Sequence, residues 1–113
     1  MESGALFHIN ESSPEKQRAA LRNIRNLMTE MPDLRTELTI QGDAINLVVA
    51  SETSWEEELR ELQQRGLLVT VCRNTLQGKN VAEDALLPDL TIVPSAVGRI
   101  VLRQQEGFAY VKP

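Results

Sequence analysis

The segment Leu67-Leu68-Val69-Thr70-Val71-Cys72-Arg73-Asn74-Thr75-Leu76 is the most strand-like stretch of the chain, and it decides the fold class. A mostly apolar run with several branched residues is typical of a strand that is buried on both faces of a sheet. The residues after Cys72 favour a turn into a short helix. We therefore expect Cys72 at the carboxyl end of a buried strand, next to the start of a helix.

Strand and helix patterns alternate on both sides of this segment. Further strands are predicted at residues 5–10, 34–41, 90–93 and 108–111. Helices are predicted between strands by caps and by apolar residues spaced three and four apart; they follow Ser13, Ser54 and Ser95 and end at Pro32, Gly66 and Gly107. Because such alternation requires crossover connections, the pattern predicts an α/β fold with a mostly parallel sheet covered on its faces.

Three local patterns give more detailed expectations. Polar and apolar residues alternate over 34–41, which predicts a strand with one face more exposed to solvent, as in an edge strand or a lightly covered strand. Residues 44–50 are almost entirely apolar and favour a short buried helix, although a strand fits the pattern as well. Ser54 and Glu57 have the spacing of a capping box at the start of a helix.

Size and composition limit the classes of protein that the chain can belong to. Its 113 residues fit one domain spanning 1–113, and a net charge of -4 disfavours binding to nucleic acid or anionic membrane surfaces. No apolar run approaches the roughly 20 residues that cross a bilayer, and the start of the chain lacks a secretory signal. We therefore expect a cytoplasmic protein. Its single cysteine, Cys72, excludes an internal disulfide and a multi-cysteine metal site.

Functional groups in parallel sheets gather beyond the carboxyl ends of the strands, and the loop after Cys72 is the most informative candidate. A thiol beside a helix N-terminus faces unpaired amides and a positive dipole end, which favour the thiolate. Arg73 can add positive charge, while Asn74 and Thr75 can donate hydrogen bonds. The alternative is that Cys72 is a small hydrophobic residue of the core.

Other candidate residues have weaker signals. His8 can manage a proton or pair with Cys72 if their strands bring them within reach, but a core or interface histidine is the simpler interpretation. Asn46 ends a loop, residues 42–46, that lacks the glycine pattern of a phosphate site. Trp55 is interpreted as a core or subunit contact, with ligand stacking as the alternative. The glutamates at 56–58 complement a helix dipole, and no metal site or cofactor is expected.

The chain resembles the DsrE/DsrF-like family of small sulfur-metabolism proteins. The resemblance rests on ordered segments along nearly the whole chain: residues 7–9, 45–47, 71–76, 93–95 and 105–113. It implies a three-layer α/β/α sandwich with a five-stranded parallel sheet, assembled as a trimer or hexamer. Relay members of the family carry a persulfide on a cysteine after the third strand, which corresponds to Cys72. Where those members have a helix of small residues, this chain has residues 73–76, so it resembles a divergent branch.

The leading hypothesis is a sulfur-carrier or sulfurtransferase-like protein. In it, Cys72 accepts sulfane sulfur as a persulfide, Arg73, Asn74 and Thr75 stabilise the anion, and His8 manages protons. With no second thiol, the acceptor is a thiol-bearing protein, a second subunit or a small thiol. The alternative is a non-catalytic oligomeric module that binds a small ligand or supports assembly, with a buried, structural Cys72. A nucleotide-binding regulator of flavodoxin-like architecture is a third hypothesis, disfavoured by the missing phosphate loop.

Overall fold

The computed structural model describes residues 3–113, which form a five-stranded sheet flanked by helices. The strands are β1 (Gly4–Ile9), β2 (Arg35–Ile40), β3 (Leu68–Cys72), β4 (Thr91–Val93) and β5 (Ala109–Val111). The α-helices are α1 (Pro14–Glu30), α2 (Glu56–Gln64), α3 (Arg73–Gly78) and α4 (Ala96–Gln105). Two short 3-10 helices, η1 (Gly42–Leu47) and η2 (Glu83–Ala85), complete the elements.

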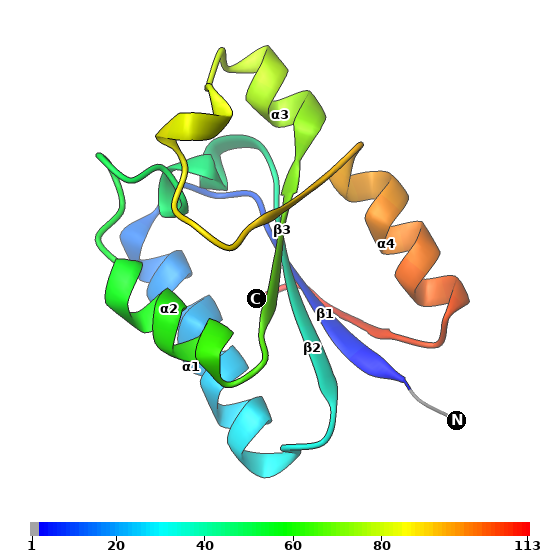
Figure 1. The fold of residues 1–113 in the computed structure, drawn as a ribbon. Helices are drawn as coiled ribbons and strands as arrows, with labels where there is room; N and C mark the ends of the chain where they lie inside the picture. The colour runs from blue at the N-terminus through cyan, green and yellow to red at the C-terminus, as the bar shows by residue number, and fades with distance from the viewer. Residues whose placement is uncertain (1–2) are drawn as a thin grey trace.

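The sheet has the order β4-β3-β2-β1-β5, and all of its neighbouring strands are parallel. Helices α1 and α2 cover one face and α4 covers the other (Figure 1). The expected three-layer α/β/α sandwich is therefore confirmed, with a sheet that is parallel throughout. None of the helices within residues 3–113 is long and apolar enough to cross a membrane.

The main core lies between the sheet and the pair α1 and α2. Helix α1 starts as predicted, with the Ser13 hydroxyl accepting from the Lys16 amide at 3.4 Å and Pro14 in the first turn. Its apolar stripe is buried against alternate residues of the strands: Phe7, Ile9, Leu38, Ile40, Val69 and Val71. Burial of each large side chain contributes about 1.5–3 kcal/mol, which makes this layer the main source of stability.

The prediction that residues 34–41 form an edge or lightly covered strand is wrong. Strand β2 is the central strand, and its residues from Thr36 to Ile40 are buried on both faces. Glu37 is only 1% exposed, because its carboxylate is paired with Arg99 and Arg103 of α4. A charged residue with buried partners gives the same alternation in sequence as one that faces water.

The start of α2 also differs from the prediction, whereas its end agrees. The expected capping box of Ser54 and Glu57 is not formed; Trp55 occupies the N-cap position without a side-chain cap, and its amide donates to the Thr53 hydroxyl at 3.0 Å. The turn therefore closes one residue later than the sequence pattern suggested. At the other end, Gly66 has a φ of +112°, which suits glycine at a helix terminus. The predicted short helix near residues 44–50 is present as η1.

Candidate functional site

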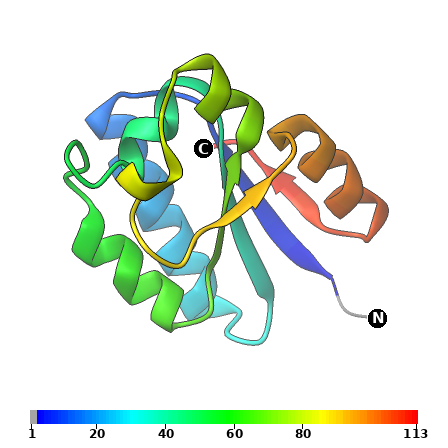
Figure 2. The same ribbon diagram turned by 45° about the horizontal axis from the view of Figure 1, so that its top comes forward.

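Cys72 is the last residue of β3 and the N-cap of α3, as the sequence predicted. Val69 and Val71 belong to the core, and because side chains alternate along a strand, Thr70 and Cys72 lie on the α4 face of the sheet. The register pairs Cys72 with Val93, the last residue of β4. Figure 2 shows β3 leading directly into α3, with β4 and α4 beside it. The thiol therefore lies where two strands end and two helices begin.

The surroundings of the sulfur favour the thiolate. Burial raises the pKa of the Cys72 thiol, since its residue is only 2% exposed. Hydrogen bonds from the Thr75 hydroxyl and from the backbone amides of Ala96, Thr75 and Asn74 act in the opposite direction, and the net result is a pKa below the ordinary value. These amides belong to the first turns of α3 and α4, so the start of each helix contributes donors to one sulfur atom.

The loop after β2 fixes the Thr75 hydroxyl. The Gly42 amide donates to Thr75 Oγ1 at 2.9 Å, and Gly42 adopts a φ of +59°, a conformation that side chains disfavour. Because the hydroxyl oxygen already accepts this bond, its own proton is available for donation to the Cys72 sulfur. An exposed ion pair between Lys79 and Asp43, 2.7 Å long, links α3 to the same loop. The loop of residues 42–46 and the segment after Cys72 therefore meet at this edge.

A buried ion cluster fixes α4, and with it the Ala96 amide. Glu37 accepts from Arg99 Nε and Arg103 Nε at 2.7 Å each, and from the Thr70 hydroxyl at 2.8 Å. Burial raises the pKa of Glu37, but the hydrogen bonds from Arg99, Thr70 and Arg103 outweigh it and hold the pKa below 4.5. This cluster was not predicted from the sequence. Two features of the sequence could have indicated it. Arg99 and Arg103 lie four residues apart on the predicted helix after Ser95, and Glu37 lies in the middle of a predicted strand.

A small hollow opens beside the sulfur. It has a volume of about 280 Å³ and is lined by the start of α4 and the end of β4: Val93, Pro94, Ser95, Gly98, Arg99 and Leu102. Val93 is the register partner of Cys72, and Ser95 precedes the Ala96 whose amide bonds the sulfur. Cys72 itself does not line the hollow. A small molecule in this space would contact Val93, the register partner of Cys72.

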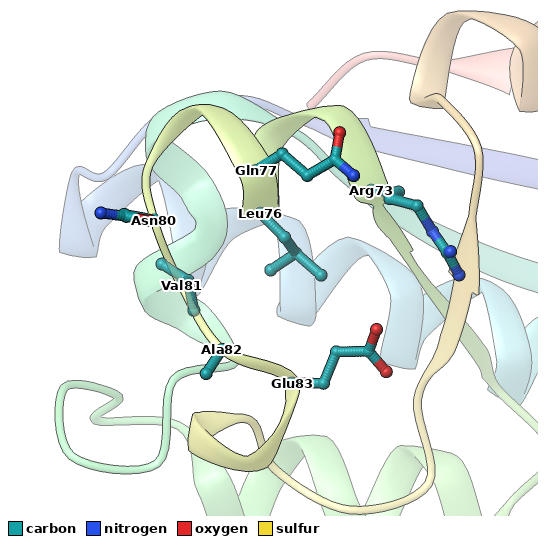
Figure 3. A pocket seen from close by; sticks show the side chains of 7 residues that line it. All are labelled: Arg73, Leu76, Gln77, Asn80, Val81, Ala82 and Glu83. Atoms are coloured by element: carbon teal, nitrogen blue, oxygen red, sulfur yellow. The ribbon is translucent and has the colours of Figure 1, made fainter.

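The Arg73 side chain extends into another hollow, between α3 and η2 (Figure 3). This open space of about 380 Å³ also receives Leu76 and, from the opposite wall, Glu83. Arg73 is therefore not among the groups that hydrogen-bond the sulfur, unlike Asn74 and Thr75.

His8 lies on β1, with β2 between it and the strand of Cys72. Its Nε2 is 2.8 Å from the Gln41 amide oxygen and its Nδ1 is 2.7 Å from the Tyr110 hydroxyl. Because that oxygen can only accept, Nε2 carries the proton and Nδ1 accepts from Tyr110. Burial lowers the pKa of His8 below 6.5, and Lys112 adds to this effect, whereas the Gln41 bond opposes it. Both ring nitrogens are occupied, so the conceivable Cys72–His8 pair is not formed.

Asn46 holds two loops together instead of facing the sulfur. Its amide oxygen accepts from Gln17 Nε2 at 2.6 Å, and its Nδ2 donates to the Ser12 carbonyl at 3.3 Å. Both ends of the amide are thus used between η1 and the start of α1. Asn46 therefore supports the carboxyl edge of the sheet on which Cys72 lies.

Two solved structures are similar to the chain over its whole length. One, described as the protein of unknown function MTH1491 from Methanobacterium thermoautotrophicum, superposes with a TM-score of 0.94 at 31% identity, covering 99% of this chain and 100% of its own. The other, the ychN protein from E. coli, has a TM-score of 0.81 at 13% identity, with 100% of both chains covered. At that identity the second likeness shows the fold alone. No curated protein matches the chain.

The match to a family model agrees with the resemblance of the sequence. The model of the DsrE/DsrF-like family matches residues 4–113, nearly the whole chain, including the strand that ends at Cys72. The five parallel strands and flanking helices agree with the solved neighbours. The chain therefore belongs to the DsrE/DsrF-like family.

Proposed function

We propose that the protein is a sulfur carrier, sulfurtransferase-like in its chemistry, and that Cys72 holds the sulfur as a persulfide. Its family is generally linked to sulfur relay. The observation that carries the proposal is the position of one sulfur at the end of β3 and the start of α3, with the end of β4 alongside it, where backbone amides and the Thr75 hydroxyl lower the pKa of the thiol. These donors favour an anion on sulfur despite the burial of the site.

Loading is a thiol exchange at sulfur. The Cys72 thiolate attacks the sulfane sulfur of a donor such as a polysulfide; a new S–S bond forms, the donor's S–S bond breaks, and the remainder of the donor leaves as an anion. The negative charge of the product lies on the terminal sulfur of Cys72. We expect the same amides and the Thr75 hydroxyl to donate hydrogen bonds to that charge.

Unloading uses the same property of the thiol. An acceptor thiolate attacks the terminal sulfur, the bond to Cys72 breaks, and Cys72 leaves as a thiolate. A thiol with a lowered pKa is a better leaving group, so the donors that favour loading also favour release. Because the chain contains one cysteine, no internal disulfide competes with transfer. The acceptor is a thiol-bearing protein, a second subunit or a small thiol.

A homo-oligomer, a trimer or hexamer, is part of the proposal. Helix α4 exposes Val97, Val101 and Leu102, which are 61%, 51% and 43% accessible, and Tyr110 of β5 is 39% accessible. Neighbouring exposed apolar side chains favour contact with another protein surface. A single free cysteine and the absence of disulfides suit a reducing compartment, which supports a cytoplasmic location.

The burial of Cys72 favours a second candidate function. At 2% exposure the thiol has the position of a structural core residue, and the chain would then be an oligomeric module that binds a small ligand. The hollow of about 280 Å³ beside the sulfur would be a natural place for such a ligand. Under this alternative Cys72 resists alkylation in the native protein.

Intact mass separates the two candidates. The native protein is incubated with inorganic polysulfide, and its mass is recorded with and without a reductant. We expect a gain of one sulfur atom that the reductant removes and that Cys72→Ser does not show. Thr75→Val is expected to load more slowly. A protein that gains no sulfur, and whose Cys72 also stays unalkylated, would instead support the structural thiol.

A further inference from the structure

The groove between α1 and α2 contains an unusual concentration of positive charge. Arg18, Arg22 and Arg25 follow one another at helical spacings of four and three, so they share one face of α1. Together with Trp55 and Glu58 they line a hollow of about 180 Å³. The site lies on the face of the sheet opposite to α4, and it takes no part in the proposed chemistry of Cys72.

These three guanidinium groups have no carboxylate partner within residues 3–113. By contrast, Arg99 and Arg103, which line other hollows, both pair with Glu37. Glu58 is the only acid that lines the groove, and it forms no ion pair there. Like charges four residues apart on a helix repel each other, so the arrangement costs stability unless an anion is present.

Arg25 supplies an independent observation. Its Nε is fully buried, yet it has no hydrogen-bond acceptor among the described residues. Buried side-chain donors nearly always have a partner, because a missing one leaves the cost of desolvation uncompensated. Arg25 also lines the hollow. Arg25 therefore combines a buried donor that has no acceptor with a place in the lining of a positively charged hollow.

We propose that this hollow binds a phosphate-type tetrahedral dianion. Three guanidinium groups against one carboxylate leave two positive charges, which a dianion balances. Guanidinium groups donate paired N–H bonds that fit such oxygens. The volume is below that of most sites for drug-sized ligands, which suits a single anionic group. That group is either a free inorganic anion or the phosphate of a monoester; the recognition chemistry is the same.

Trp55 makes the proposal directly measurable. It is the only tryptophan of the chain, and the Arg18 guanidinium lies 5.6 Å from the centre of its ring. Binding of an anion to the arginines changes the charge next to the indole and therefore its fluorescence. Inorganic phosphate is titrated into the native protein at constant ionic strength, with chloride as the matched control. We expect a saturable change with phosphate and none with chloride.

Variants locate the site. Arg22→Gln and Arg25→Gln should each weaken phosphate binding roughly tenfold, the loss expected for one charge-assisted bond. Glu58→Gln should tighten binding, because it removes the opposing charge. Arg60→Gln makes the same change of charge on the exposed surface of α2 and should have no effect. In nuclear magnetic resonance, the Arg25 Nε–H signal should shift at the same phosphate concentrations.

A second titration identifies the source of the anion. Glycerol phosphate that binds more tightly than inorganic phosphate would indicate a monoester, and equal or weaker binding would indicate a free anion. The proposal is overturned if phosphate gives no saturable change in the millimolar range, or if Arg25→Gln binds it as well as the native protein does. Cys72→Ser should bind phosphate normally, so failure of the sulfur-carrier hypothesis does not affect this test.

Discussion

Replacement of Glu37 by glutamine should loosen α4 from the sheet. The substitution retains the size of the side chain but removes the charge that holds Arg99 and Arg103, both at 2.7 Å. The Glu37 side chain is 1% exposed, and those of Arg99 and Arg103 are 18% and 9% exposed. Loss of one partner from such a buried pair leaves the other charges without compensation.

The expected loss is about 3–5 kcal/mol of the free energy of unfolding. Unfolding entropy is about 2.1 cal/mol/K per residue, or roughly 0.24 kcal/mol/K for 113 residues. The melting temperature of Glu37→Gln should therefore fall by roughly 13–21 °C. The exposed pair of Glu56 and Arg60 provides the control: Glu56→Gln should cost about 0.3–0.5 kcal/mol, or about 1–2 °C.

Thermal unfolding followed by circular dichroism measures both variants at neutral pH and in acid. The pKa of Glu37 is lowered in the folded protein, so its stabilisation is complete above the unfolded value near 4.5 and is lost as the pH falls through the folded value. The difference in melting temperature between the native protein and Glu37→Gln should therefore become smaller below pH 4.5. The role of the cluster is refuted if Glu37→Gln melts within a few degrees of Glu56→Gln, or if the difference in melting temperature does not depend on pH.

Three further predictions concern the thiol, the sheet and the surface. Thr75→Val should raise the pKa of Cys72, measured by thiolate absorbance, while Thr75→Ser should leave it nearly unchanged; equal values in the two variants would remove the hydroxyl from the argument. Gly4→Ala should destabilise the protein in urea unfolding by about 1–3 kcal/mol, because the added Cβ would collide with the Arg35 carbonyl and the Phe108 ring. Gly78→Ala is the control, since a Cβ at that position meets no atom within 4 Å. Val101→Lys should reduce the mass of the proposed homo-oligomer in light scattering, and an oligomer of unchanged mass would place the proposed interface elsewhere.

Most of the fold could be predicted from the chain because its local signals agree with one another. Continuous apolar strands, the Ser13 cap and Gly66 each place an element boundary near its position in the structure. The position of Cys72 at a strand end next to a helix start followed from the residues on each side of it. The order of the strands could not be predicted, because a parallel strand carries no sequence signal for the neighbour with which it pairs.

The wrong prediction for β2 has a long-range cause. The arginine partners of Glu37 are more than 60 residues away in the chain, so its alternation with apolar residues looked like exposure to water. The side chains of His8 and Asn46 are likewise held by contacts across the sheet edge that their neighbours in sequence do not indicate. Trp55 packs against the core, in agreement with the prediction, and it also lies beside the arginines of α1.

A carrier must release the sulfur that it accepts. The protein is loaded with polysulfide, freed of excess donor and mixed with a small thiol, and its intact mass is followed with time. We expect the loaded protein to return to its original mass while one sulfane sulfur per chain appears on the added thiol. Thr75→Val should discharge more slowly, because its Cys72 is a poorer leaving group. A chain that never gains sulfur on Cys72, or that keeps it in the presence of excess thiol, is not a sulfur carrier.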